Sequence, residues 1–252
     1  MESTDYIFGI RAVIEAIEAG KEIDKVFIRK DLQGEALLKE LLDKLHLSRV
    51  PVQRVPVERI NRITRKNHQG VLAMLSAVTY HRLDHVVPEL YEDGVLPFVV
   101  VLDGITDVRN FGAIARTCEC AGVDAIVIPE RGSVSVGGDA VKTSAGALLH
   151  IPVCRERSAA GAVRFLKDNG YKIVAASEKA DINYTQADYT GPVAIVMGAE
   201  DVGISPEVLK QCDTFVSIPQ FGHIGSLNVS VAAGVIIYEV VRQRLAGNLE
   251  VI

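Results

Sequence analysis

From residue 98 onward the chain contains short, uninterrupted apolar segments, and this feature most constrains its fold. Residues 98–102, 125–128 and 193–197 carry no charged side chain. Strands that helices cover on both faces of a parallel sheet have this composition, because neither face of such a strand meets water. Further strands are predicted at 151–153, 171–176 and 215–218, and helices at 110–121, 159–169 and 227–245. Alternation of strands with helices predicts an α/β domain built on a parallel sheet.

The first 77 residues form a second, smaller α/β pattern. Apolar residues recur at helical spacing in 9–19 and 35–45, and a short helix is predicted over 57–65. Strands are expected at 25–29, 52–55 and 71–75. Residues 78–97 hold two prolines and the turn Glu92-Asp93-Gly94, so we expect a linker with a short helix there. The predicted organisation is therefore a domain over 1–77, a linker over 78–97 and a domain over 98–252.

The cysteines and histidines do not form a recognisable metal site or disulfide framework. None of the cysteines belongs to a C-x-x-C pair, and no third ligand accompanies the two histidines that lie four positions apart. We expect reduced, mostly buried thiols, solvated histidines and no metal. The residues concerned are Cys118, Cys120, Cys154, Cys212, His81 and His85.

The ends and the charge of the chain limit its location and its partners. The first residues are acidic and lack the pattern of a secretory signal, and no apolar run is long enough to span a bilayer. A cytoplasmic protein without membrane attachment is therefore expected. The net charge of −5 argues against a simple nucleic-acid binder. However, residues 1–77 carry a balance of +2, and the remainder carries −7.

A basic segment at residues 49–66 accounts for this asymmetry. Arg59, Arg62 and Arg65 recur every three residues, which places them near one face of the predicted short helix, and Lys66 follows directly. Such a face can bind phosphates without reading sequence. The spacing alone slightly favours a merely solvated helix face over a phosphate-binding one.

Three polar, glycine-containing loops follow predicted strands, at residues 103–112, 198–205 and 218–228. Ligands of open α/β sheets bind at the carboxyl ends of strands, so these loops are the candidate site. Taken singly, Asn110 and Ser226 are explained as helix caps and Glu200 as a surface carboxylate. The chain lacks a G-x-G-x-x-G, a P-loop and a G-x-S-x-G motif, which disfavours a dinucleotide-dependent oxidoreductase, a P-loop enzyme and an α/β-hydrolase.

The three loops together resemble the motifs of the SpoU/TrmH family of RNA ribose 2′-O-methyltransferases. Residues 110–116 (NFGAIAR), 196–203 (VMGAEDVG) and 218–230 (IPQFGHIGSLNVS) are similar to the first, second and third motif, in family order. The resemblance covers about residues 98–245, and the third motif is the most specific. The first 77 residues, including Phe8-Gly9 and His68-Gln69-Gly70-Val71, resemble the L30e-like RNA-binding domain of the guanosine-specific 23S ribosomal RNA members. Gln220 and Asp201 depart from the family pattern, where methionine and glycine are common.

The resemblance implies an α/β-knot (SPOUT) fold with a deep C-terminal trefoil knot, which general rules of topology would not suggest. It implies S-adenosyl-L-methionine as methyl donor without a metal, RNA as substrate and a homodimer through the knot region. The reaction implied is methylation of a guanosine ribose 2′-hydroxyl, with 23S ribosomal RNA as the leading substrate. The donor would contact Met197, Gly198, Ile218, Ser226 and Leu227.

The resemblance also assigns the catalytic residues. Arg116 has the central role, and Asn110, Glu200, Ser226 and Asn228 would orient it, the donor and the ribose. A guanidinium stays protonated in proteins, so we expect Arg116 to hold a phosphate and stabilise the developing alkoxide, although a general base is the usual description. The resemblance favours RNA contact by Arg59, Arg62, Arg65 and Lys66. A transfer-RNA methyltransferase of the same family and an RNA-binding or ribosome-assembly protein without turnover remain alternatives.

Overall fold

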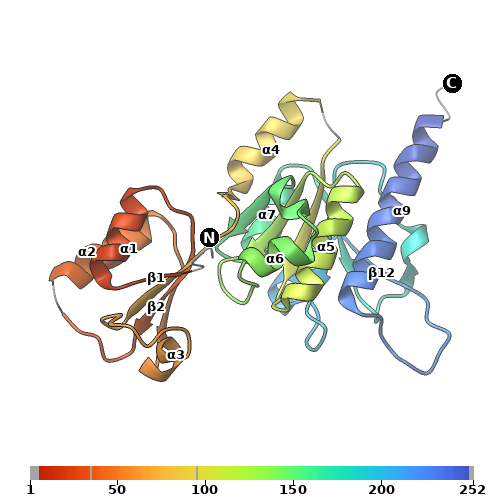
Figure 1. The fold of residues 1–252 in the computed structure, drawn as a ribbon. Helices are drawn as coiled ribbons and strands as arrows, with labels where there is room; N and C mark the ends of the chain where they lie inside the picture. Colours follow the sequence, from red (N-terminus) through yellow and green to blue (C-terminus); the bar gives the residue numbers. More distant parts are fainter. Residues whose placement is uncertain (1–5, 35, 95, 250–252) are drawn as a thin grey trace. The chain divides into compact units, whose positions relative to one another are not determined.

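The computed structural model describes residues 6–34, 36–94 and 96–249. The chain divides into two compact units, each with its own sheet (Figure 1). The smaller unit holds the chain up to Thr79 together with Ser135–Asp139, and the larger unit holds Tyr80–Val134 and the chain from Ala140 onward. The segment 78–97, expected as a linker, contributes strand β5 (Tyr80–His81) and helix α4 (Leu83–Glu92) to the larger unit.

The smaller unit is a mixed sheet covered by helices on both faces. Its strands are β1 (Tyr6–Phe8), β4 (Val71–Leu75), β2 (Ile23–Arg29) and β3 (Val52–Val55), in that order across the sheet. Val26 and Ile28 point toward α1 (Ile10–Glu18) and α2 (Ala36–Leu47), because alternate residues of a strand face the same side. Phe27 points to the opposite face, where it packs with Ile60 of α3 (Val57–Asn61).

One sequence prediction for the smaller unit was wrong, and one of its strands was missed. Helix α3 ends at Asn61, so Arg62 is its C-cap, and Arg65 and Lys66 lie in the loop beyond it. The expected common helix face for Arg59, Arg62 and Arg65 therefore does not form. Strand β1 was not predicted, because three residues are too few for a recognisable alternation.

The larger unit is built on a sheet in which every described strand pair is parallel. Among the described residues the strand order is β10-β12-β9-β11-β6-β7-β8-β5. The strand predicted at 151–153 lies at 153–156, after the buried Ile151 and the half-buried Pro152. The short strand β10 was not predicted. The bounds are β6 (Phe98–Asp103), β7 (Ala125–Pro129), β8 (Val153–Glu156), β9 (Lys172–Ala176), β10 (Ile182–Asn183), β11 (Val193–Gly198) and β12 (Thr214–Ser217).

Helices cover both faces of this sheet, as the apolar strands require. Val99, Val127 and Val196 pack in one cluster with α4 and α7 (Ala159–Asp168). Their neighbours Val100 and Ile195 face the other way and are also fully buried. On that side α9 (Val229–Leu249) contacts β11 and packs along α5 (Val108–Cys120) (Figure 1). No helix in the described part of the chain is long and apolar enough to cross a bilayer.

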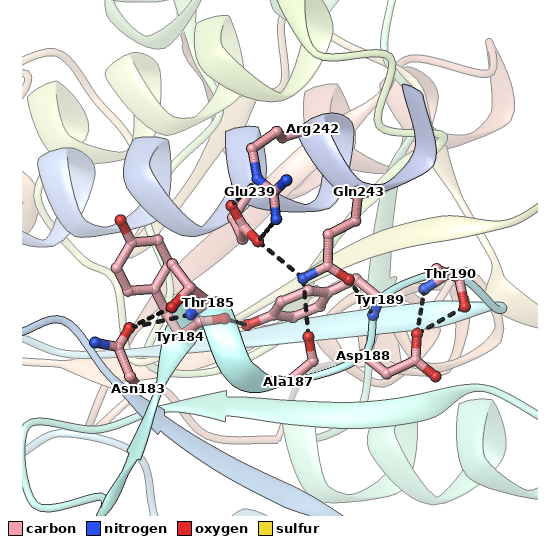
Figure 2. A network of polar contacts seen from close by, with 10 residues as sticks. All are labelled: Asn183, Tyr184, Thr185, Ala187, Asp188, Tyr189, Thr190, Glu239, Arg242 and Gln243. Carbon is pink, nitrogen blue, oxygen red and sulfur yellow. Dashed lines mark hydrogen bonds and ion pairs between the residues drawn. The ribbon is translucent and has the colours of Figure 1, made fainter. Parts of the chain in front are cut away.

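A polar network anchors the C-terminal half of α9 to the segment after β10. The Gln243 side chain donates to the Ala187 carbonyl at 2.9 Å and accepts from the Tyr189 N–H at 3.1 Å. The buried Glu239 accepts from Gln243 at 2.8 Å and pairs with Arg242 (Figure 2). Tyr189 is fully buried beneath these side chains, with its hydroxyl on the Tyr184 carbonyl. The network therefore fixes the position of α9 along the sheet.

The ion pair in this network predicts a pH-dependent stability. The two hydrogen bonds from Arg242 lower the pKa of Glu239 below its ordinary value. A depressed carboxyl pKa contributes stability above the unfolded-state pKa, roughly 4.3, and that contribution is lost as pH falls through the folded-state value. We expect Glu239→Gln to lower the melting temperature by a few degrees at pH 7 and by progressively less below pH ~4. A difference in melting temperature between the variant and the wild type that stays constant from pH 7 to pH 3 would contradict this account.

Candidate active site

A cavity of about 530 Å³ lies at the carboxyl ends of β9, β11 and β12 in the larger unit. It is lined by the loops after these three strands and by the first turns of α9. Its size suits a small organic ligand. The structure brings together in its lining every residue that the sequence assigned to donor binding, namely Met197, Gly198, Ile218, Ser226 and Leu227.

Gly198 is the point at which the second loop turns back on itself. Ala199 and Gly203 exchange two backbone hydrogen bonds, of 3.1 and 2.9 Å, which close the turn. A Cβ atom on Gly198 would lie 2.3 Å from the Gly203 carbonyl carbon and from the Ile204 nitrogen. The turn is tied to β6 because Asp103 accepts a hydrogen bond from the Ser205 N–H at 2.7 Å. Only glycine fits at position 198 while this turn stays closed.

Asn228 joins all three predicted loops. Its Nδ2 donates to Asn110 Oδ1 at 2.9 Å and to Glu200 Oε1 at 2.6 Å. Its Oδ1 accepts from the backbone and hydroxyl of Ser230, as an N-cap of α9 does. Glu200 also accepts from the Val229 N–H at 3.2 Å, so its charge lies at the helix N-terminus, where an anion is stabilised. The Asn228 amide is fully used within the protein, which makes it a positioning residue.

The start of α5 differs from the sequence interpretation. The N-cap is Asp107, whose carboxylate accepts from the N–H groups of Arg109 and Asn110 at 2.9 Å each. The helix therefore begins two residues earlier than predicted, and the Asn110 side chain is left to reach Asn228. The alternative reading of Asn110 as a helix cap was wrong.

The structure does not bring Arg116 or Ser226 into this hydrogen-bonded cluster. Arg116 is exposed on α5, outside the cavity lining, and makes no hydrogen bond or ion pair with any described residue. Ser226 lines the cavity at its exposed rim, also without a partner in the described chain. Both side chains are therefore available to groups from outside this chain.

In the smaller unit, the four predicted RNA-binding residues are all exposed. The Arg59 guanidinium lies 5.1 Å from the centre of the Phe27 ring, and the Lys66 ammonium lies 6.0 Å from that of Phe8. Arg62 and Arg65 have no hydrogen bond or ion pair within the described residues. The positive charges thus border the sheet face that α3 covers. Arg59 lies on the helix itself, whereas Arg65 and Lys66 lie on the loop after it.

Sequence reasoning missed one wall of the cavity. The segment 176–179, which follows β9, lines it with the exposed side chains of Glu178 and Lys179. The signal was present, because residues 171–176 are a strand with a polar loop directly after it. The position of β9 between β11 and β12 is what places this loop at the cavity, and strand order is not readable from the sequence.

The cysteines are free thiols, and they suit structural positions better than chemistry. Cys118 and Cys154 are buried, and burial raises the pKa of Cys154 to about 12 and that of Cys212 to about 11. Cys120 is exposed, unlike the mostly buried set that was expected. Within the described residues, no group of three or more His, Cys, Asp or Glu side chains is arranged to hold a metal ion.

The parallel sheet, the cavity at its strand ends and the polar cluster from three loops are typical of an α/β domain with a site for a small ligand. The chain belongs to the SpoU rRNA methylase family, whose model matches residues 97–238. A second model, for the RNA 2′-O ribose methyltransferase substrate-binding domain, matches residues 6–81.

Individual relatives agree with this assignment. A protein of Staphylococcus saprophyticus named "Putative TrmH family tRNA/rRNA methyltransferase" is 38% identical, covering 94% of this chain and 95% of its own length. The AdoMet-bound rRNA methyltransferase of Sinorhizobium meliloti is 25% identical with a TM-score of 0.57, over 94% of this chain and 86% of that one. The SpoU methyltransferase AviRb of Streptomyces viridochromogenes shares the fold, at 24% identity and a TM-score of 0.61. The match covers 96% of this chain and 91% of that one. These similarities confirm the predicted α/β-knot (SPOUT) fold class.

Proposed function

We propose that this protein transfers a methyl group from S-adenosylmethionine to the ribose 2′-hydroxyl of a guanosine, with 23S ribosomal RNA as the substrate. The observation that carries the proposal is the hydrogen-bonded cluster of Asn110, Glu200 and Asn228 at the edge of a cavity in a chain of this family. Ribosomal RNA as substrate would place the enzyme in the cytoplasm.

The residues of the cavity fit the proposed donor. Ile218, Leu227 and Ile236 offer apolar walls for an adenine ring. The close turn at Gly198 brings the backbone of the second loop to the cavity wall, where it can face the adenosine. Glu178 and Glu200 supply negative charge for a cationic ligand. When bound, the donor supplies an already activated methyl group, so a metal is not required.

The remaining task of the protein is to align and activate a weakly acidic ribose hydroxyl. The proposed role of Arg116 is to hold the RNA phosphate beside that hydroxyl and stabilise the oxygen as it loses its proton. The cluster around Asn228 holds the start of α5 against the start of α9, and Arg116 lies on α5. Ser226 is free to contact the ribose or the donor at the rim.

The test is a comparison of 2′-O-methylation in RNA from cells with and without the gene. Ribosomal and transfer RNA are purified from both strains, and 2′-O-methylated positions are mapped by resistance to alkaline cleavage and by mass spectrometry. We expect one guanosine of 23S RNA to lose its methyl group and to regain it when the purified protein and labelled donor are added. If the 2′-O-methylated positions of ribosomal RNA are unchanged and those of transfer RNA differ between the strains, the assignment of 23S RNA as substrate is overturned.

A transfer-RNA substrate is the second candidate, because the name of the Staphylococcus relative covers both tRNA and rRNA. The same mapping separates the two. An RNA-binding protein without turnover is the third, and it predicts no labelled product with any RNA. The presence together of all the residues that the family resemblance assigns to catalysis argues against it, namely Asn110, Arg116, Glu200, Ser226 and Asn228.

We further propose that two copies of the chain pair through α9. Val231, Tyr238 and Leu245 recur every seven residues and are 52%, 51% and 60% exposed, so they form an apolar stripe on one helix face. In a two-fold dimer the same patch meets itself, which suits a single stripe of this kind. Tyr238→Asp is expected to convert a dimer to a monomer in sedimentation analysis. Leu47→Asp, at an isolated exposed leucine of the smaller unit, is the control and should leave the dimer intact.

The smaller unit is proposed to deliver the RNA. Replacing Arg59, Arg62 and Arg65 together by glutamine should weaken RNA binding and lower the slope of log affinity against log salt by roughly 2 to 3, because each lost phosphate contact removes about one counterion. Donor affinity, measured by calorimetry, should not change. An unaltered salt slope would assign these charges to a solvated surface.

A further inference from the structure

Helix α5 carries a basic stripe on its exposed face. Arg109 and Arg116 are seven positions apart, so they lie on one side of the helix. Ala113 lies between them on that side, and Cys120 follows Arg116. Both arginines are exposed, and neither makes a hydrogen bond through its side chain or an ion pair with any described residue. The four positions of the stripe, 109, 113, 116 and 120, hold no acidic residue. Arg116 already has a proposed role, whereas Arg109 does not.

A third exposed cation lies on a helix that packs against the start of α5. Lys142 is exposed on α6 (Gly138–Thr143) and has no ion pair within the described residues. Its neighbour Thr143 donates a hydrogen bond at 3.2 Å to the carbonyl of Val108, the residue directly before Arg109. The two helices meet closely there, since a Cβ atom on Gly112 would lie 2.2 Å from the Thr143 hydroxyl. Lys142 therefore stands beside the first turn of α5.

The position of Arg109 is not explained by the stability of its helix. It lies in the first turn of α5, where the helix dipole favours anions and disfavours cations. Asp107, two residues before it, is engaged as the N-cap by two backbone N–H groups. An unpaired arginine here is a small electrostatic cost to folding, and binding of an anion to it would offset that cost.

We infer that Arg109 and Lys142 form a phosphate-binding surface of the larger unit, which holds the RNA backbone next to the target ribose. Arg109 directly precedes Asn110, whose side chain is bonded to Asn228 at the edge of the cavity. A phosphate on Arg109 would thus lie adjacent to the reacting nucleotide, about 10 Å along the helix axis from one on Arg116. The inference rests on the proposed function for the identity of the nucleic acid. It adds binding residues that belong to the larger unit and not to the RNA-binding residues predicted in the smaller one.

The test uses the full-length protein and an unmodified 23S RNA transcript as probe. The variants are Arg109→Gln, Arg109→Glu and Lys142→Gln, with Arg164→Glu as the control. Arg164 is exposed on α7, which covers the opposite face of the sheet, and its replacement makes the same change in charge as Arg109→Glu. Measurements are RNA affinity between 50 and 200 mM salt, donor affinity by calorimetry, KM for RNA and melting temperature.

Arg109→Gln and Lys142→Gln should each lower the salt slope by about 1 and weaken RNA binding by about tenfold at low salt. Arg109→Glu should weaken it further, raise KM for RNA and leave donor affinity unchanged. Its melting temperature should equal or exceed that of the wild type, because an acid now meets the helix N-terminus. Arg164→Glu should bind RNA like the wild type.

An unchanged salt slope in both glutamine variants overturns the inference, as does an equal loss of RNA binding in Arg164→Glu. A lower melting temperature of Arg109→Glu also counts against it, because the arginine would then serve folding. A wild-type protein that binds RNA through Arg109 but transfers no methyl group would instead overturn the proposed function and leave the surface in place.

Discussion

Replacing Arg116 by alanine should lower the rate of methyl transfer by roughly 10²- to 10³-fold, the range found when one stabilising donor is removed from an active site. The side chain is exposed and lies outside the cavity, so donor affinity and melting temperature should not change. The measurements are single-turnover transfer of labelled methyl to RNA, calorimetry with the donor and thermal denaturation. A loss of donor binding in parallel with rate would assign Arg116 to the cavity and contradict the proposed role.

Arg116→Lys separates charge from geometry. Lysine keeps the positive charge but cannot make the two parallel hydrogen bonds of a guanidinium to a phosphate. We expect the lysine variant to recover only a small part of the lost rate. Near-normal turnover would show that a point charge is enough and that bidentate recognition is wrong.

The place of Arg116 outside the cavity lining also raises the question of which copy of the chain it serves. Mixed dimers answer it if one protomer carries Arg116→Ala and the other a blocked donor cavity. Activity of the mixture, where each parent is inactive, requires that Arg116 acts on the cavity of the partner. An inactive mixture, with mixed dimers shown to form, would assign Arg116 to its own chain.

Gly198→Ala is expected to disable the donor cavity. The added methyl group would overlap the backbone at Gly203 and Ile204, so the closed turn must open or the strand end must shift. Overpacking of this kind costs roughly 1–3 kcal/mol of folding free energy. Because the same turn lines the cavity, we expect donor affinity to fall by at least tenfold, with a clear drop in melting temperature.

Gly191→Ala is the matched control for this prediction. Gly191 precedes the same strand, and a Cβ atom there would meet nothing within 4 Å. It should be neutral in stability and in donor binding. Equal behaviour of the two alanine variants would show that the turn at Gly198 relaxes at no cost, and the steric explanation of this glycine would fail.

The sequence predicted the main strands of the larger unit and the long helices well, because these elements bury continuous or periodic apolar residues. It missed β1, β5 and β10, which have two or three residues each and owe their conformation to their sheet neighbours. It extended α3 through Arg65, whereas the helix ends at Asn61. Prediction therefore failed where local residues do not determine the backbone.

The candidate site also has a part that the sequence predicted and a part that only the structure shows. Resemblance to family motifs identified Gly198, Ile218 and Leu227, and the structure places all three in one cavity. It could not show that Asn228 uses its whole amide for positioning, nor that Asp107 rather than Asn110 caps α5. It also could not place Glu178 and Lys179, since their loop reaches the cavity only through the order of the strands.

The sequence by itself determined the class of fold and the chemistry available, because hydrophobic patterning and residue types are local properties. The tertiary structure decided which of those residues act together. Asn110 and Asn228 are 118 positions apart, and their hydrogen bond of 2.9 Å exists only because α5 and α9 pack side by side. A hydrogen bond needs approach to about 3 Å, and only packing brings residues this distant in sequence so close.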